Sequence, residues 1–412
     1  MIRRWTMNRR KGLRAALIRR MDWAGFVGGA LVAAAVWLIV HGSHEPSVSP
    51  DPWNGTGTEW TAGAEANGAP GNDREAGQEK SGGEKAKAEQ KAGGKKGQGE
   101  SRESFPSADK PVQAQSSIPL TDRLLVRVYL SAEKRIETVP LETYVRGVVA
   151  AEMPLSFEPA ALEAQALAAR TYIVRRLLYR DKTGVPVPAA DVTDTQTHQV
   201  YRSLADMDSL KKSDEAAWDK ADAAARKTKG KILTYKGEPI EALYFASSNG
   251  YTENSEDVFP FSLPYLRSVA SPWDREETDA WSETKEFSLQ QFYKALGIKN
   301  SAVLARNGAS DDVHIADRTK GLRVKTLQVG GQTLSGTEAR DKLELRSAAF
   351  DLTATSRNVV ITTYGNGHGV GMSQWGAEGM AKQGKTAEQI VKHYYLGIQV
   401  EEASKLAGRL AL

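Results

Sequence analysis

The chain of 412 residues contains no cysteine. This absence excludes a disulfide framework and every metal site that is built on thiolates. A strong excess of positive charge is also missing, because the formal net charge is only +4. Residues 1–20 carry eight Lys and Arg and no acidic residue, which leaves −4 for residues 21–412. A large basic surface for nucleic acid is therefore not expected.

The basic N-terminal block precedes an apolar run at 23–40. As a helix this run would be roughly 27 Å long, which is marginally enough to span a bilayer. No Lys or Arg follows until Arg74. The positive-inside rule predicts a cytoplasmic segment at 1–22, a single transmembrane helix at 23–40 in the cell membrane, and an extracytoplasmic remainder. The alternative is a cleaved signal peptide, but no small-x-small cleavage pattern follows the run, so an uncleaved anchor is favoured.

Composition divides the rest of the chain. Residues 41–117 are rich in Gly, Glu, Lys and Ser, and are predicted to be a disordered tether with a reach of roughly 50 Å. Beyond it, 118–400 predicts one folded domain, with 285–350 as a smaller inserted lobe and 401–412 as a tail. Strands and helices mix there without regular βαβ alternation, which predicts an α+β fold of helices on mixed or antiparallel strands. The main elements expected are a hairpin at 124–140, a strand pair at 231–246, and helices at 141–152, 159–180, 214–229, 375–383 and 386–395.

One acidic residue stands where the pattern calls for a buried side chain. The helix at 141–152 has an apolar stripe that begins at Leu141, and Glu152 lies eleven residues later on the same face. Pro154 then ends the helix. Burial and the negative end of the helix dipole would both raise the pKa of Glu152, as a general acid requires. The pattern alone leaves open that Glu152 reaches solvent at a frayed helix end.

Other polar residues are candidates for substrate binding. On the second helix, Arg170 flanks the apolar stripe beside Gln165 and Tyr172, and the alternative for Arg170 is an ordinary surface arginine whose stem packs on the protein. Three irregular segments, DVTDTQTHQVYRS, FASSNGYTENSEDVF and GNGHGVGMSQWGA, offer side chains that suit sugar hydroxyls, although turn chemistry explains some of them. The glycine spacing matches neither a dinucleotide fingerprint nor a P-loop, which argues against nucleotide binding. The candidates in these segments are His198, Tyr201, Ser247, Ser248, Asn249, Thr252, Glu253, His368, Ser373 and Gln374.

The stretch VPLETYVRGVVAAEMPLSFEPAALEAQALAARTY closely resembles the signature of the stage II sporulation protein D family, which also includes amidase enhancer domains. The three irregular segments follow in the family's order, and the resemblance covers roughly 121–398. It implies a lytic transglycosylase with Glu152 as catalytic acid and Arg170 in the glycan cleft. Such an enzyme cleaves the β-1,4 bond between N-acetylmuramic acid and N-acetylglucosamine without water and leaves a 1,6-anhydro end. One carboxyl group suffices for this reaction.

The resemblance further implies action on peptidoglycan during engulfment, with two partners, an amidase called stage II sporulation protein P and a membrane scaffold called protein M. No cofactor is expected. Family members with cysteines around the histidine of the TDTQTH-type segment are similar to zinc sites, but His198 stands here without cysteine, so no metal is expected. The alternative function is a non-catalytic, glycan-binding enhancer of a cell-wall amidase.

Overall fold

A computed structural model describes residues 123–298 and 313–410. The predictions for 1–22, 23–40 and 41–117 lie outside the described residues, as do the ends of the predicted domain and tail at 118–122 and 411–412. Among the helices that are described, none is long and apolar enough to cross a membrane.

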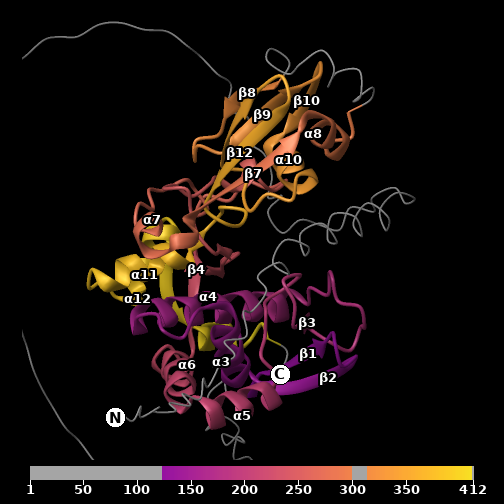
Figure 1. The fold of residues 1–412 in the computed structure, drawn as a ribbon. Coiled ribbons are helices and arrows are strands. Elements are labelled where there is room, and N and C mark those ends of the chain that lie inside the picture. The colour runs from indigo at the N-terminus through magenta and orange to yellow at the C-terminus, as the bar shows by residue number, and fades with distance from the viewer. Residues whose placement is uncertain (1–122, 299–312, 411–412) are drawn as a thin grey trace, which may run out of the picture. The chain divides into compact units, whose positions relative to one another are not determined.

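The described chain opens with the predicted hairpin, β1 (Leu125–Leu130) and β2 (Arg135–Pro140) (Figure 1). Val128 of β1 pairs with Glu137 of β2. Alternate residues of β1 are buried, which is the period of a strand that covers a core on one face. The short strand β3 (Val192–Thr193) adds to β1 in parallel.

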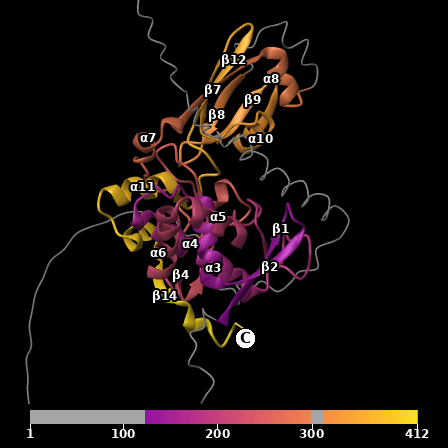
Figure 2. The ribbon, with the colours of Figure 1, turned by 60° about the horizontal axis from the view of Figure 1, so that its bottom comes forward.

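Helices form the main core. The helix α3 (Leu141–Glu152) and the long helix α4 (Pro159–Tyr179) fall where the sequence predicts them, and Pro159 occupies the first turn of α4. Figure 2 shows α3 and α4 beside α6 (Glu215–Lys227), and all three contact one another. Many α4 core positions are alanine, which lets neighbouring helices approach closely. The sequence did not predict α5 (Leu204–Ser213), which begins with a capping box at Ser203.

Small sheets and further helices complete this part. The predicted strand pair at 231–246 forms differently, because its second strand divides in two. The first piece pairs with β4, and Pro239 at its end cannot donate to a ladder. The second piece, β6, pairs in parallel with β13. The elements are β4 (Lys231–Tyr235), β5 (Glu238–Pro239), β6 (Tyr244–Phe245), η2 (Ser255–Asp257), α7 (Asp274–Glu277), η3 (Asp279–Trp281), β13 (Met372–Ser373), α11 (Gln374–Lys382), α12 (Ala387–Tyr394), β14 (Gln399–Glu402) and η4 (Ala403–Leu406).

A second hydrophobic core lies within the chain between η3 and β13, and we call its elements the β7–β12 lobe. Its two three-stranded antiparallel sheets have the orders β11-β12-β7 and β10-β9-β8. Phe292, Leu327, Phe350 and Ile361 are buried in its core. The elements are β7 (Ser282–Ser288), α8 (Leu289–Ala295), β8 (Val313–Arg318), β9 (Val324–Val329), β10 (Gln332–Ser335), α10 (Gly336–Lys342), β11 (Phe350–Ala354) and β12 (Asn358–Tyr364).

The described residues therefore form an α+β fold of several small sheets and helices. At the C-terminal end, Ala403, Leu406 and Leu410 are buried, so these residues of the predicted tail belong to the main core.

Candidate active site

Glu152 is the last residue of α3, and its carboxylate is hydrogen-bonded to residues from two other segments. Its Oε1 atom accepts hydrogen bonds from the backbone N–H of Val200 at 2.7 Å and from the Tyr244 hydroxyl at 3.0 Å. The three residues come from α3, from the loop before α5 and from β6. Among the described residues, no hydrogen bond engages Oε2 of Glu152, and the side chain keeps partial exposure. One carboxylate oxygen is thus fixed, and the other remains able to exchange a proton with a ligand.

The predicted rise in the pKa of Glu152 is confirmed. Burial raises its pKa from 4.5 to about 7, while the hydrogen bonds from Val200 and Tyr244 act in the opposite direction because they stabilise the carboxylate. Near neutral pH the group is therefore present in both protonation states, and it can serve as acid and as base.

A chain of hydrogen bonds continues behind the carboxylate. The Tyr244 hydroxyl accepts from Nε2 of Gln199 at 3.2 Å, and Oε1 of Gln199 accepts from the Tyr144 hydroxyl at 3.0 Å. Burial raises the pKa of both tyrosines well above the usual value, so both stay neutral donors. Tyr244, Gln199 and Tyr144 were not predicted from the sequence as site residues.

Two of the predicted binding residues, both buried, are linked to the backbone of Glu152, Gln374 directly and Gln165 through Gln374. Nε2 of Gln374 donates to the backbone carbonyl of Glu152 at 3.1 Å and lies 3.4 Å from Oε1 of Gln165. Gln374 is the first residue of α11, and Gln165 lies on α4, so these amides join two helices at the end of α3.

His368 supports the site from the glycine-rich loop. Its Nδ1 atom accepts from the backbone N–H of Val370 at 3.1 Å, and its Nε2 atom lies 3.1 Å from the carbonyl oxygen of Tyr244. Burial lowers the pKa of His368 to about 3, so the ring stays neutral. In the same loop, a Cβ on Gly371 would lie 2.1 Å from the Leu243 carbonyl oxygen, so only glycine permits this approach.

The structure corrects the prediction for Arg170, which does not line a cleft. Its side chain is 0% exposed and forms an ion pair with Glu142 at 2.6 Å between Nη2 and Oε2. The guanidinium also donates to the Ala225 carbonyl at 3.0 Å and to the Thr228 hydroxyl at 3.1 Å. Arg170 therefore joins α3, α4 and the end of α6, because a buried guanidinium needs partners for its donors.

The polar residues of the FASSNGYTENSEDVF segment are likewise committed to the protein itself. Those that the structure buries, against the prediction of glycan contact, are Ser247, Ser248, Thr252 and Glu253, together with Ser373, Tyr201, Gln165 and Gln374 from the other segments. Ser248 and Ser373 donate to the carboxylate of Asp274, and the Tyr201 hydroxyl donates to Glu137 at 3.0 Å. Buried polar groups require such partners, so these side chains build turns and do not present donors to a ligand.

The three remaining candidates are half-buried and also have partners in the protein. Asn249 donates from Nδ2 to the Gly321 carbonyl at 2.9 Å. His198 accepts at Nδ1 from the backbone N–H of Thr193 at 3.1 Å, and burial lowers its pKa to about 4, so it closes its own loop as a neutral ring. The ring of Tyr172 lies 5.9 Å from the Arg176 guanidinium. In residues 123–298 and 313–410, no group of three His, Asp or Glu side chains is placed to hold a metal ion.

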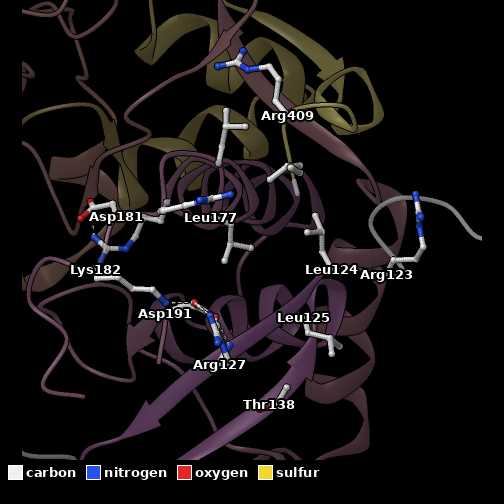
Figure 3. A pocket seen from close by; sticks show the side chains of 14 residues that line it. Arg123, Leu124, Leu125, Arg127, Thr138, Leu177, Asp181, Lys182, Asp191 and Arg409 are labelled. Carbon is white, nitrogen blue, oxygen red and sulfur yellow. Dashed lines mark hydrogen bonds and ion pairs between the residues drawn. The ribbon is translucent and has the colours of Figure 1, made fainter. Parts of the chain in front are cut away.

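A pocket of about 560 Å³ lies between the β1–β2 hairpin, the end of α4 and the C-terminal segment (Figure 3). Figure 3 shows Leu124 and Leu177 between Arg409 on one side and the ion-paired Arg127 and Asp191 on the other. None of the predicted site residues lines this pocket, which is therefore separate from the carboxylate of Glu152.

The α+β fold and the Glu152 carboxyl at the end of α3 can be set beside known proteins. Residues 129–235 match the family model described as stage II sporulation protein. A protein described as stage II sporulation protein D from Bacillus subtilis (strain 168) is 44% identical over 311 residues, which cover 74% of this chain and 88% of that protein. One of the same description from Bacillus amyloliquefaciens is 45% identical over 285 residues, covering 69% and 80%. The chain belongs to the stage II sporulation protein D family, and these relatives support a role in sporulation.

A further relative bears a different description. A protein described as an amidase enhancer from Bacillus subtilis (strain 168) is 31% identical over 303 residues, which cover 61% of this chain and 39% of that protein.

Proposed function

We propose that the chain is a lytic transglycosylase of peptidoglycan with Glu152 as its catalytic acid. The observation that carries the proposal is the Glu152 carboxyl itself, which has a pKa of about 7, one oxygen held by Val200 and Tyr244, and partial exposure. Family membership supports the same assignment.

In the proposed reaction, protonated Glu152 gives its proton to the oxygen of the β-1,4 bond, and the bond from that oxygen to the anomeric carbon of N-acetylmuramic acid breaks. The 6-hydroxyl of the same sugar forms the new bond to the anomeric carbon and returns its proton to Glu152. Atoms and charge balance without water, and the products are a free 4-hydroxyl end and a 1,6-anhydro end.

A single carboxyl with a pKa of about 7 fits both steps. A carboxyl group at its usual pKa is almost fully ionised at neutral pH and makes a poor acid, whereas one with a pKa far above 7 makes a poor base. The hydrogen bonds from Val200 and Tyr244 hold Oε1, so the proton would be exchanged at Oε2.

The setting proposed for this reaction rests on the pattern of the N-terminal sequence and on the family resemblance. We place the domain outside the cytoplasm, anchored in the cell membrane by residues 23–40, where it would act on peptidoglycan glycan strands during engulfment. The proposed partners remain the amidase stage II sporulation protein P and the scaffold protein M. Peptide removal by the amidase and glycan cutting by this chain would need the two enzymes at one place.

The test incubates the full-length protein with purified peptidoglycan and measures anhydro-muropeptides by mass spectrometry. Wild type is expected to release them, and Glu152→Gln is expected to release none. Glu163→Gln is a matched control, because Glu163 lies on α4 and pairs with Lys227 at 3.2 Å. Equal, background release by wild type and Glu152→Gln would refute the enzyme assignment.

The second candidate is a non-catalytic enhancer of an amidase, which the similarity to the amidase enhancer favours. It predicts that the wild type binds glycan and stimulates an added cell-wall amidase without forming anhydro ends, and that Glu152→Gln stimulates equally.

A further inference from the structure

One buried arginine joins the β7–β12 lobe to the rest of the fold. Arg323 directly precedes β9, and only 3% of its side chain is exposed. Its Nη1 atom donates to the Tyr251 carbonyl at 3.2 Å and to Oε1 of Glu253 at 3.3 Å. Both acceptors belong to the segment after β6, so the guanidinium of a lobe residue is held by the part of the fold that also carries Tyr244.

The same guanidinium packs on the glycine-rich loop. A Cβ on Gly369 would lie 2.2 Å from Cζ of Arg323, so the two groups touch across a position that admits no side chain. The backbone N–H of Glu253 donates to the Gly369 carbonyl at 2.8 Å. Arg323, Glu253 and Gly369 thus form one packed unit that holds the loop at 365–371.

The loop transmits this contact to the site. Because Nδ1 of His368 accepts the Val370 N–H, the hydrogen of the neutral ring is on Nε2, which donates to the Tyr244 carbonyl at 3.1 Å. That bond positions the backbone of Tyr244, whose hydroxyl donates to Glu152 at 3.0 Å. An unbroken series of contacts therefore runs from Arg323 to the carboxylate.

We propose that Arg323 is a positioning residue, which holds the loop at 365–371 and thereby keeps the Tyr244 hydroxyl on Glu152. The inference rests on the proposed function only for the catalytic role of Glu152. The contacts that run from Arg323 to Tyr244 do not depend on that function. The β7–β12 lobe, which does not supply the acid, would then control its proton affinity.

The expected direction follows from the hydrogen bond. The titratable groups that face Glu152 among the described residues are Tyr244 and, behind it, Tyr144, and both are neutral. The Tyr244 hydroxyl lowers the pKa of Glu152 because it stabilises the carboxylate. Displacing Tyr244 should therefore raise the pKa of Glu152 above its wild-type value.

The experiment measures this pKa directly, by a ¹³C NMR titration of the Glu152 carboxyl in the full-length protein without glycan. The main variant is Arg323→Met with Glu253→Gln, which leaves no unpaired charge behind. It should raise the midpoint by about 0.5 pH units or more, roughly a threefold change in proton binding. Arg323→Lys keeps a charge for Glu253 but loses the planar contact over Gly369, and should raise the midpoint as well.

Two controls separate positioning from general loosening of the lobe. Arg318→Ala removes another lobe arginine, which pairs with Asp351 at 2.6 Å, and should leave the midpoint unchanged. In a Tyr244→Phe background, the Arg323→Met and Glu253→Gln pair should cause no additional change, because the bond it acts through is already gone. A wild-type midpoint in both Arg323 variants, or a full shift that persists in the Tyr244→Phe background, would overturn the inference.

The result is independent of glycan cleavage. A raised midpoint in a protein that forms no anhydro product would refute the proposed function and leave the positioning role of Arg323 intact. If the protein forms anhydro product and the Arg323 variants titrate with the wild-type midpoint, the proposed function stands and the positioning role of Arg323 is refuted.

Discussion

Glu152→Gln is predicted to stabilise the protein at alkaline pH and not at acidic pH. The folded protein holds Glu152 at a pKa of about 7, compared with 4.5 as its ordinary value. A carboxyl whose pKa is raised on folding causes no loss of stability at a pH below its pKa in the unfolded protein. There the group is protonated in the folded and in the unfolded protein alike. The loss grows as the pH rises from 4.5 and is complete above about 7, because the fold then has to bury a charge.

The size of the effect follows from the shift. A rise of this extent corresponds to about 3 kcal/mol at full ionisation, since one pKa unit is about 1.4 kcal/mol. The amide oxygen of the introduced glutamine can still accept from Val200 and Tyr244, so the substitution removes the buried charge without removing the acceptor. For a domain of this size, about 3 kcal/mol corresponds to a Tm increase of roughly 6–12 °C.

Thermal and urea unfolding of wild type and Glu152→Gln at pH 4.5 and pH 8 measure this difference. The variant should be more stable at pH 8 and nearly equal to wild type at pH 4.5. Glu163→Gln, which removes only a partly exposed ion pair, should change stability by at most about 1 kcal/mol. A variant that is destabilised at pH 8, or equally changed at both pH values, would show that Glu152 is not held in an environment that disfavours its charge.

Three further predictions concern the surroundings of the acid. Tyr244→Phe should raise the pKa of Glu152, so the alkaline limb of the pH–rate profile for anhydro-muropeptide release should move to higher pH; a limb that stays in place would contradict the hydrogen bond. Arg170→Ala should cost about 3–5 kcal/mol in urea unfolding, because Glu142 loses its buried partner; unchanged stability with lost glycan binding would restore the cleft role. Gly147→Ala should cost about 1–3 kcal/mol, because its Cβ would lie 2.4 Å from a buried tyrosine ring. Thermal unfolding measures the loss of stability in Gly147→Ala, and a wild-type Tm would refute the close contact between Gly147 and the tyrosine ring.

Local patterns in the sequence were sufficient for the elements that bear the acid. The apolar stripe that begins at Leu141 predicts α3, and Pro154 predicts its end, so the position of Glu152 on the buried face of a helix end follows from neighbouring residues alone. Side-chain periodicity is set by the chain's own geometry, which is why these predictions agree with the structure. The helices predicted at 375–383 and 386–395 also agree with α11 and α12.

The partners of the acid depend on contacts between distant segments. Val200 and Tyr244 lie 48 and 92 residues beyond Glu152, and no local pattern distinguishes Tyr244 from any other strand tyrosine. Tertiary structure also reversed the roles of Arg170 and Glu253, whose polar side chains suggested ligand contacts but form ion pairs in the interior. The sequence by itself predicted helix α3 and the position of Glu152 at its end. Only the tertiary structure decided its proton affinity, because burial and hydrogen bonds are supplied by segments that meet when the chain folds.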